Sequence, residues 1–218
     1  MNMQNEMTLR QPPKPHRRMV ISSLTAILVF AAIALDTKVV RIGSEEDVRE
    51  QSFSPEAFAK RTFPEIQSFV LENAVPAREV LEAIEQDKKA AAERYGVAAG
   101  VGPVIPVSFR GVVGNGKSGI YSIFVEGWPE GYQLRVQTGP AINGTDLRDA
   151  TGSIKFGQFT NQIEYQDAGA ALNRAMKSAV LDSIDTSDLS GKSVRVVGVF
   201  KLINPKNWLV TPVRLELK

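Results

Sequence analysis

Residues 111–118 read GVVGNGKS and match the phosphate-binding pattern G-x-x-x-x-G-K-[ST] letter for letter. A phosphate-binding loop has to run from a strand into a helix, because the free N–H groups of the helix N-terminus hold the phosphates. Here Gly119 is followed by β-branched and aromatic residues up to Val125, which favours a strand. Asn115-Gly116 is also a favoured pair for a tight turn between strands. We therefore predict a β-hairpin at this position and no nucleotide site.

The second candidate for chemistry is the polar stretch 139–165, which gathers amide, carboxylate and guanidinium groups. Such groups bind a hydroxyl-rich ligand or a polar peptide surface, and long loops in compact domains are often functional. The candidate ligand- or partner-binding residues are Arg148, Asp149, Asn161, Gln162, Glu164 and Asn173. A structural role is the alternative: Arg148 would pair with a carboxylate and Asp167 would cap a helix. In that alternative Asn161 and Gln162 would satisfy backbone groups.

The composition narrows the chemistry that these residues can perform. The 218 residues contain no cysteine and a single histidine, His16, near the N-terminus. Zinc sites of the Cys/His type, serine–histidine triads and cysteine nucleophiles are therefore excluded. Carboxylate and lysine chemistry remain. Asp146 and Asp149 lack the ligand density of a calcium-binding loop, so we expect neither a metal nor a cofactor.

The N-terminal region indicates export. Residues 1–18 carry four basic residues and one acidic residue, and residues 19–35 form an uncharged apolar run that ends at Asp36. A basic flank before an apolar segment stays in the cytoplasm, and the remainder crosses the membrane. Seventeen residues are at the short end of the ~17–25 that span a bilayer. We predict a cytoplasmic stub (1–18) and a single transmembrane signal-anchor (19–35), although Ala32-Ile33-Ala34 resembles a cleavage site.

The charge balance argues against nucleic acid as a partner. The chain has 26 basic and 24 acidic residues, of which residues 1–18 hold four and one. The remaining 22 basic and 23 acidic residues nearly cancel. The basic sequence pI thus comes from the N-terminal stub and is no footprint of nucleic-acid binding.

Helix signals follow a linker at residues 36–53. Ser54-Pro55-Glu56 supplies a capping residue, a proline for the first helical position and an acid for the first turn. We expect Pro64 to break or restart this helix. Further helices are predicted at 77–87 and 88–95, which makes 54–96 a helical region. Its helices either pack on the main core or serve as a partner-binding or spacer element.

The period of the sequence changes after residue 96, and residues 97–218 form the predicted main domain. Three short β-type runs, a helix at 166–184 and two further β-type runs joined by a turn follow one another. This order is that of an OB-like five-stranded Greek-key barrel. The fold class is therefore α+β, mainly β with helices, with an N-terminal helical region and one transmembrane helix.

Residues 139–173 carry the most distinctive pattern of the chain. The chain resembles, over roughly residues 37–218, a bacterial family of predicted periplasmic lipoproteins of unknown function that are often encoded beside ABC-type sugar importers. The resemblance implies an OB-like barrel with an added helical part. It also implies a lipidated cysteine after the apolar segment, where this chain has Asp36 instead. The matching residues are Gly139-Pro140, Gly144-Thr145, Leu147-Arg148-Asp149, Phe156, Phe159 to Tyr165, Leu172-Asn173, Gly191, Gly198 and Thr211-Pro212-Val213.

Three functions are compatible with this sequence. The first rests on the predicted export, the predicted anchor and the resemblance together: a protein anchored in the inner membrane by residues 19–35, with its C-terminal domain in the periplasm. There it would assist a sugar import system by contacting the ABC permease or substrate-binding protein. The second function is a stand-alone binding module for a small polar or saccharide ligand. The third, ranked last because no distinctive catalytic motif is present, is a hydrolase that uses two of Asp146, Asp149 and Glu164.

Overall fold

The computed structural model describes residues 15–37 and 53–218 and divides the chain into two units, Met1–Ser52 and Phe53–Lys218. The first unit contains one helix, α1 (Pro15–Asp36), and its side chains are described from Val20 onward. Within the described residues, no helix combines the length and apolarity required to cross a membrane. The structure therefore does not support the transmembrane helix predicted at residues 19–35. Most of the predicted stub (1–18) and linker (36–53) lies outside the described residues.

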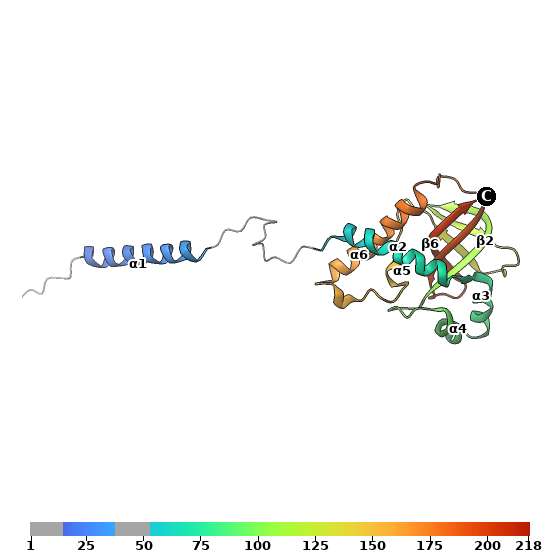
Figure 1. Cartoon of the computed structure of the whole chain (residues 1–218), viewed down its shortest axis with the longest axis horizontal. Coiled ribbons are helices and arrows are strands. Elements are labelled where there is room, and N and C mark those ends of the chain that lie inside the picture. Colours follow the sequence, from blue (N-terminus) through green and yellow to red (C-terminus); the bar gives the residue numbers. More distant parts are fainter. Residues whose placement is uncertain (1–14, 38–52) are drawn as a thin grey trace, which may run out of the picture. The chain divides into compact units, whose positions relative to one another are not determined.

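The second unit is a barrel with helices around it (Figure 1). Its helices are α2 (Pro55–Asn73), α3 (Ala77–Gln86), α4 (Lys88–Tyr95), α5 (Asp146–Asp149) and α6 (Gln162–Met176), with a 3-10 turn η1 (Phe156–Gln158) and a π-helical turn η2 (Lys177–Leu181). Its strands are β1 (Val75–Pro76), β2 (Val104–Lys117), β3 (Ile120–Phe124), β4 (Gln133–Gln137), β5 (Ser193–Lys201) and β6 (Asn207–Leu217).

Five strands close into a barrel in the order β2-β3-β4-β6-β5, because β5 pairs back onto β2. The β4–β6 pair is parallel and the other pairs within the barrel are antiparallel. The helix α6 connects β4 to β5. This is the OB-like arrangement predicted from the order of the sequence runs. The two-residue strand β1, which the sequence did not predict, extends the sheet by pairing with β2 in parallel.

The hairpin expected in place of a phosphate-binding loop is present, since β2 leads directly into antiparallel β3. Its turn lies at Ser118 and Gly119, which both have positive φ, as a tight two-residue turn requires. A side chain at Gly119 would collide with the Gly139 carbonyl. Asn115-Gly116, which was expected to form the turn, lies instead at a register shift within β2.

Two expectations about helices were wrong. Pro64 does not interrupt α2, because buried Phe63, Ile66 and Val70 pack the helix on the core on both sides of the proline. This packing offsets the hydrogen bond that a proline removes. The helix predicted from residue 166 begins at Gln162, since Asn161 caps it: the Asn161 Oδ1 accepts a hydrogen bond from the Glu164 amide at 2.9 Å. Asp167 therefore lies inside the helix and caps nothing.

Candidate functional site

The short helix α5 brings two of the predicted site residues together. Arg148 is 8% exposed, and its Nε donates to Asp149 Oδ1 at 2.9 Å. The Arg148 Nη1 donates to the Tyr165 carbonyl at 3.3 Å, and the guanidinium lies 3.7 Å from the centroid of the Tyr165 ring. Arg148 is thus held between a carboxylate and an aromatic face, which favours a buried guanidinium.

A lysine that is distant in the sequence completes the cluster. Lys201, the last residue of β5, donates from Nζ to Thr145 Oγ1 at 2.9 Å and to Asp149 Oδ2 at 3.0 Å. The Lys201 Nζ also lies 3.6 Å from Asp146 Oδ1. Thr145 Oγ1 in turn donates to Asp149 Oδ2 at 2.7 Å. We refer to Thr145, Asp146, Arg148, Asp149 and Lys201 as the charged cluster.

The two carboxylates of the charged cluster are in different electrostatic environments. Burial raises the pKa of Asp146, and the nearby Lys201 ammonium only partly offsets this effect. Burial also acts to raise the pKa of Asp149, but hydrogen bonds from Arg148, Thr145 and Lys201 together lower it below its ordinary value. Asp149 is therefore the firmly ionised member of the pair.

The charged cluster borders a pocket of about 360 Å³. Its lining combines polar groups of the cluster with the rings of Phe156 and Tyr165, whose centroids are 5.7 Å apart. Residues 98–101, Gly152, Ile154 and Lys155 form the rest of the wall. Apolar pockets with a few converging polar groups are the usual form of small-ligand sites, and this volume is at the lower end of their ~300–1,000 Å³ range.

Two buried residues on either side of the polar stretch, Gln137 and Asn173, position this cluster and do not line the pocket. The Gln137 side chain, which is buried, donates to the Asn143 carbonyl and accepts from the Asn143 amide, each at 3.0 Å. Buried Asn173 donates from Nδ2 to the carbonyls of Ile142 at 3.3 Å and Gly144 at 2.9 Å. These bonds fix the backbone of residues 142–144, directly before Thr145.

The six predicted site residues therefore fall into three groups. Arg148 and Asp149 line the pocket. Asn173 supports the preceding loop. At the start of α6, Asn161 is the cap, Gln162 is exposed, and Glu164 Oε2 accepts from the Thr160 amide at 2.9 Å. The Glu164 side chain thus reaches back one residue beyond the cap, in an arrangement close to the capping box of helix N-termini.

Sequence reasoning missed Lys201, Thr145 and Tyr165 as members of the site. Tyr165 and Thr145 belong to the distinctive stretch, but nothing in their spacing marks them as pocket residues. Lys201 ends a hydrophobic run. Because lysine is almost never buried without a partner, a lysine in such a run is a detectable signal for an ion pair. Among the residues that the structure describes, no group of three or more His, Cys, Asp or Glu side chains is placed to hold a metal ion.

A family model with the description "Predicted periplasmic lipoprotein (DUF2291)" matches residues 25–216. The chain belongs to this family. The match covers both the helical region and the barrel of the folded unit. It supports a periplasmic, membrane-associated location for this predicted periplasmic lipoprotein. The 218-residue sequence contains no cysteine, the residue that the resemblance led us to expect after the apolar segment.

The fold of this predicted periplasmic lipoprotein also occurs in a solved structure. The crystal structure of an OB-fold protein from Thermotoga maritima superimposes with a TM-score of 0.61 at 20% sequence identity. The match covers 77% of this chain and 100% of the other. At this identity the likeness concerns the fold alone. No curated protein sequence matches the chain.

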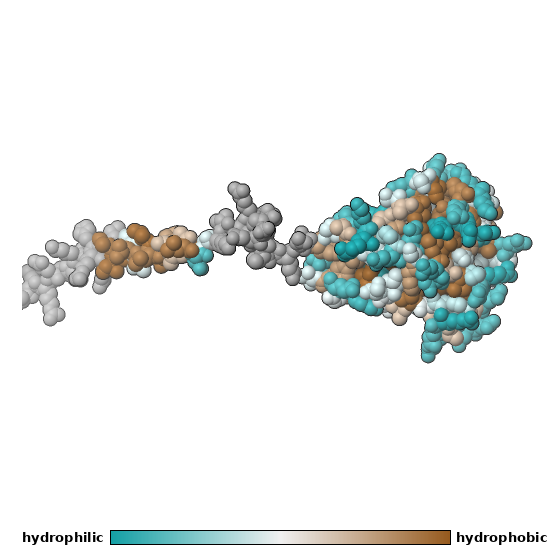
Figure 2. Space-filling model, viewed as in Figure 1, coloured by the Kyte–Doolittle hydropathy of each residue, from teal (hydrophilic) through white to brown (hydrophobic). Residues whose placement is uncertain are grey.

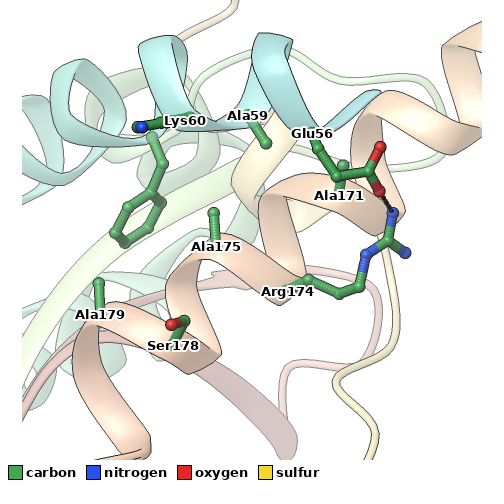
Figure 3. Close-up of a pocket in the computed structure, with 9 residues that line it drawn as sticks. Glu56, Ala59, Lys60, Ala171, Arg174, Ala175, Ser178 and Ala179 are labelled. Carbon is green, nitrogen blue, oxygen red and sulfur yellow. Dashed lines mark hydrogen bonds and ion pairs between the residues drawn. The ribbon is translucent and has the colours of Figure 1, made fainter. Parts of the chain in front are cut away.

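The folded unit also has an apolar groove between α2 and the α6–η2 segment, with a volume of about 470 Å³ (Figure 3). Small side chains from both helices, Ala59 and Ala175 among them, line it together with Phe63. At one end, Arg174 Nη2 donates to Glu56 Oε1 at 2.7 Å. This ion pair is mostly exposed. The groove thus lacks the converging buried polar groups that distinguish the pocket at Arg148.

Proposed function

We propose that this protein is a periplasmic, membrane-associated binding protein that takes a small polyhydroxylated ligand, of the saccharide class, in the pocket beside Arg148. The observation that carries the proposal is the composition of that pocket. Two aromatic rings, Phe156 and Tyr165, share a 360 Å³ space with the charged groups of Arg148, Asp149 and Lys201. Aromatic faces cover the C–H surface of a sugar ring, while charged groups exchange hydrogen bonds with its hydroxyls.

The electrostatics of the pocket favour a hydroxyl-rich ligand over a simple ion. The two cations and two carboxylates of the charged cluster already neutralise one another. A bare anion or cation would have to compete with one of these internal pairs. A hydroxyl group is donor and acceptor at once, so it can join the cluster without displacing a charge.

The resemblance noted from the sequence supplies a cellular context for such a ligand. We propose that the protein holds a saccharide close to an ABC-type importer, by contacting the permease or its substrate-binding protein. Crosslinking of the full chain in cells, followed by mass spectrometry, tests this step separately from ligand binding. Recovery of importer subunits is the expected result, and their absence from the crosslinked material would contradict it.

We propose further that residues 19–35 attach the chain to the inner membrane. The large apolar side chains described in α1, from Val20 to Leu35, are between 53% and 90% exposed. Figure 2 shows this apolar surface along α1. A run of this kind without a charged residue is stable in lipid and unfavourable in water. Replacing residues 1–35 by a cleavable secretory signal peptide, which keeps export but removes the apolar run, should release the protein into the soluble periplasmic fraction.

Ligand binding is tested by calorimetry and thermal unfolding of the purified chain with a panel of neutral and acidic monosaccharides. Phe156→Ala removes one ring of the pocket at a half-exposed position, so the fold should survive. We expect the ligand-induced rise in Tm to disappear in this variant. Phe124→Ala is the matched control, because Phe124 is equally an exposed phenylalanine but does not line the pocket. Equal loss in both variants, or no saccharide-induced shift in the unchanged chain, would contradict the proposal.

A further inference from the structure

Five aromatic rings meet at one end of the folded unit, and we call Phe53, Phe58, Phe156, Phe159 and Tyr165 the aromatic cluster. Phe53, Phe58 and Phe159 form a triangle with ring-centroid distances of 5.7, 5.2 and 5.6 Å. Phe159 and Phe156 contact Tyr165 at 5.3 and 5.7 Å. The cluster joins the start of α2 to the segment that leads into α6, and Figure 1 shows both helices beginning at the same end of the unit.

The aromatic cluster remains in contact with solvent. None of its five residues is buried, and Phe156 is 50% exposed. Ile163, in the first turn of α6 just beyond the cluster, is 69% exposed. A set of adjoining apolar side chains at the surface costs free energy in water, and such patches mark interaction sites.

The position of Phe53 indicates what this surface meets. Phe53 is the first residue of the folded unit, so the chain that follows α1 enters the unit at the aromatic cluster. Only sixteen residues separate Asp36, the end of α1, from Phe53. Sixteen residues span at most about 55 Å, so if α1 is at the membrane the aromatic cluster stays within that distance of the bilayer and can reach it.

The charges around the cluster are balanced. Residues 53–61 and 153–167 together carry three basic and three acidic residues: Lys60, Arg61 and Lys155 against Glu56, Glu164 and Asp167. Attraction to anionic lipid requires an excess of basic residues. Any attachment at this end must therefore come from apolar and aromatic side chains, which is the usual role of aromatic residues at the membrane–water interface.

We propose that the aromatic end of the folded unit docks on the surface of the bilayer, with Phe156 and Ile163 inserted among the lipid headgroups. This inference rests on the proposed membrane attachment through residues 19–35. It adds a second contact to the first, and two weak contacts on one chain reinforce each other through their effective concentration. Docking turns the pocket wall at Phe156 toward the membrane.

The natural absence of cysteine permits a direct test in the full chain. Thr160→Cys, next to Phe159 and exposed, carries an environment-sensitive fluorophore near the cluster while leaving Phe156 and Ile163 in place. Ser190→Cys is the matched control, since it is also an exposed hydroxyl residue and lies in the loop before β5. Both labelled proteins are reconstituted in phosphatidylcholine vesicles, with and without nitroxide-labelled lipid.

We expect the nitroxide lipid to quench the label at position 160 several-fold more than the label at position 190. Adding Ile163→Ser to the Thr160→Cys protein should abolish the difference, and exchanging a third of the lipid for phosphatidylglycerol should leave it unchanged. Sedimentation with the vesicles reports membrane attachment separately. A chain that sediments while position 160 stays unquenched overturns docking alone. A chain that does not sediment overturns the proposed attachment and docking together.

Discussion

The pocket at Arg148 and the groove beside Ala175 are formed by different kinds of structure. The pocket at Arg148 is formed by α5, the end of β5, the start of α6, residues 98–101 and residues 152–156. The groove beside Ala175 is the space left where two helices meet through small side chains. The pocket gathers buried charges that have to be positioned by distant parts of the chain. The groove needs no such positioning.

This difference matters because the pocket and the groove affect the free energy of folding in different ways. A buried charge is tolerated only when its partners are held in place, and removing one partner leaves the other without compensation. Apolar surface along a groove is penalised only in proportion to its area. The buried charges of the pocket therefore lower the stability of the fold unless they stay paired. A feature that is kept despite such a cost in free energy is often functional.

The sharpest way to break the comparison is to remove the lysine of the charged cluster. Lys201→Met leaves Asp146 and Asp149, whose side chains are 15% and 10% exposed, without their shared ammonium. We expect the free energy of unfolding in urea at pH 7 to fall by about 3 kcal/mol. Lys206→Met is the control, since Lys206 is exposed and lies outside the cluster, and should change it by less than about 0.5 kcal/mol. Equal unfolding midpoints for the two variants would show that the cluster is not held by Lys201.

A smaller effect is expected from the residue that supports the loop before the cluster. Asn173→Ala removes the buried donor of two partly buried hydrogen bonds, to the carbonyls of Ile142 and Gly144, and should cost about 1–3 kcal/mol. Asn161→Ala removes an exposed helix cap and should cost about 1 kcal/mol. Hydrogen exchange separates the two: the Glu164 amide should be exposed by the cap variant, and the Asn143 amide by the Asn173 variant. A reversed pattern would contradict the assigned roles.

The pH dependence of stability distinguishes the two carboxylates. The pKa of Asp149 is lowered in the folded state, so its stabilising contribution is present above the pKa of an unfolded aspartate and is lost as pH falls through the folded value. The pKa of Asp146 is raised, so the folded state binds the extra proton and its ionisation destabilises the fold as pH rises. Asp149→Asn should therefore be most destabilising at neutral pH. Asp146→Asn should become less unfavourable, relative to the unchanged chain, from acidic to neutral pH. Urea unfolding at several pH values checks this, and parallel profiles would contradict it.

The barrel was predictable because each of its elements carries a local signal. Alternating β-type runs separated by turn residues give the strand order, and the Ser54 side chain accepts from the Ala57 amide at 3.3 Å as the capping pattern predicts. The errors occurred where distant packing outweighs a local signal. Pro64 is an example, because the buried residues around it keep α2 continuous.

The pocket was only half predictable for the same reason. Arg148 and Asp149 stand in a distinctive polar stretch, but their partner Lys201 is 52 residues from Asp149 along the chain and reaches it only because the barrel closes. A local sequence pattern cannot reveal a contact between residues that lie so far apart in the chain. The cap at Asn161 was missed for a different reason. The predicted helix began at residue 166, although an asparagine three residues before a glutamate is a helix-start pattern.

The smallest effect is expected at the groove, where we predict almost no change in the stability of the fold. Glu56 and Arg174 form an ion pair at 2.7 Å, but their side chains are 71% and 59% exposed. Solvent screens such a pair, and ordering two long side chains offsets what remains of the attraction. Glu56→Gln should thus leave the urea midpoint unchanged within error at both low and high salt. Asp149→Asn, measured beside it, should shift the midpoint because its partners are buried. If both variants shift the midpoint equally, the groove depends on fixed ion pairs as the pocket does. The pocket and the groove would then not differ in this respect.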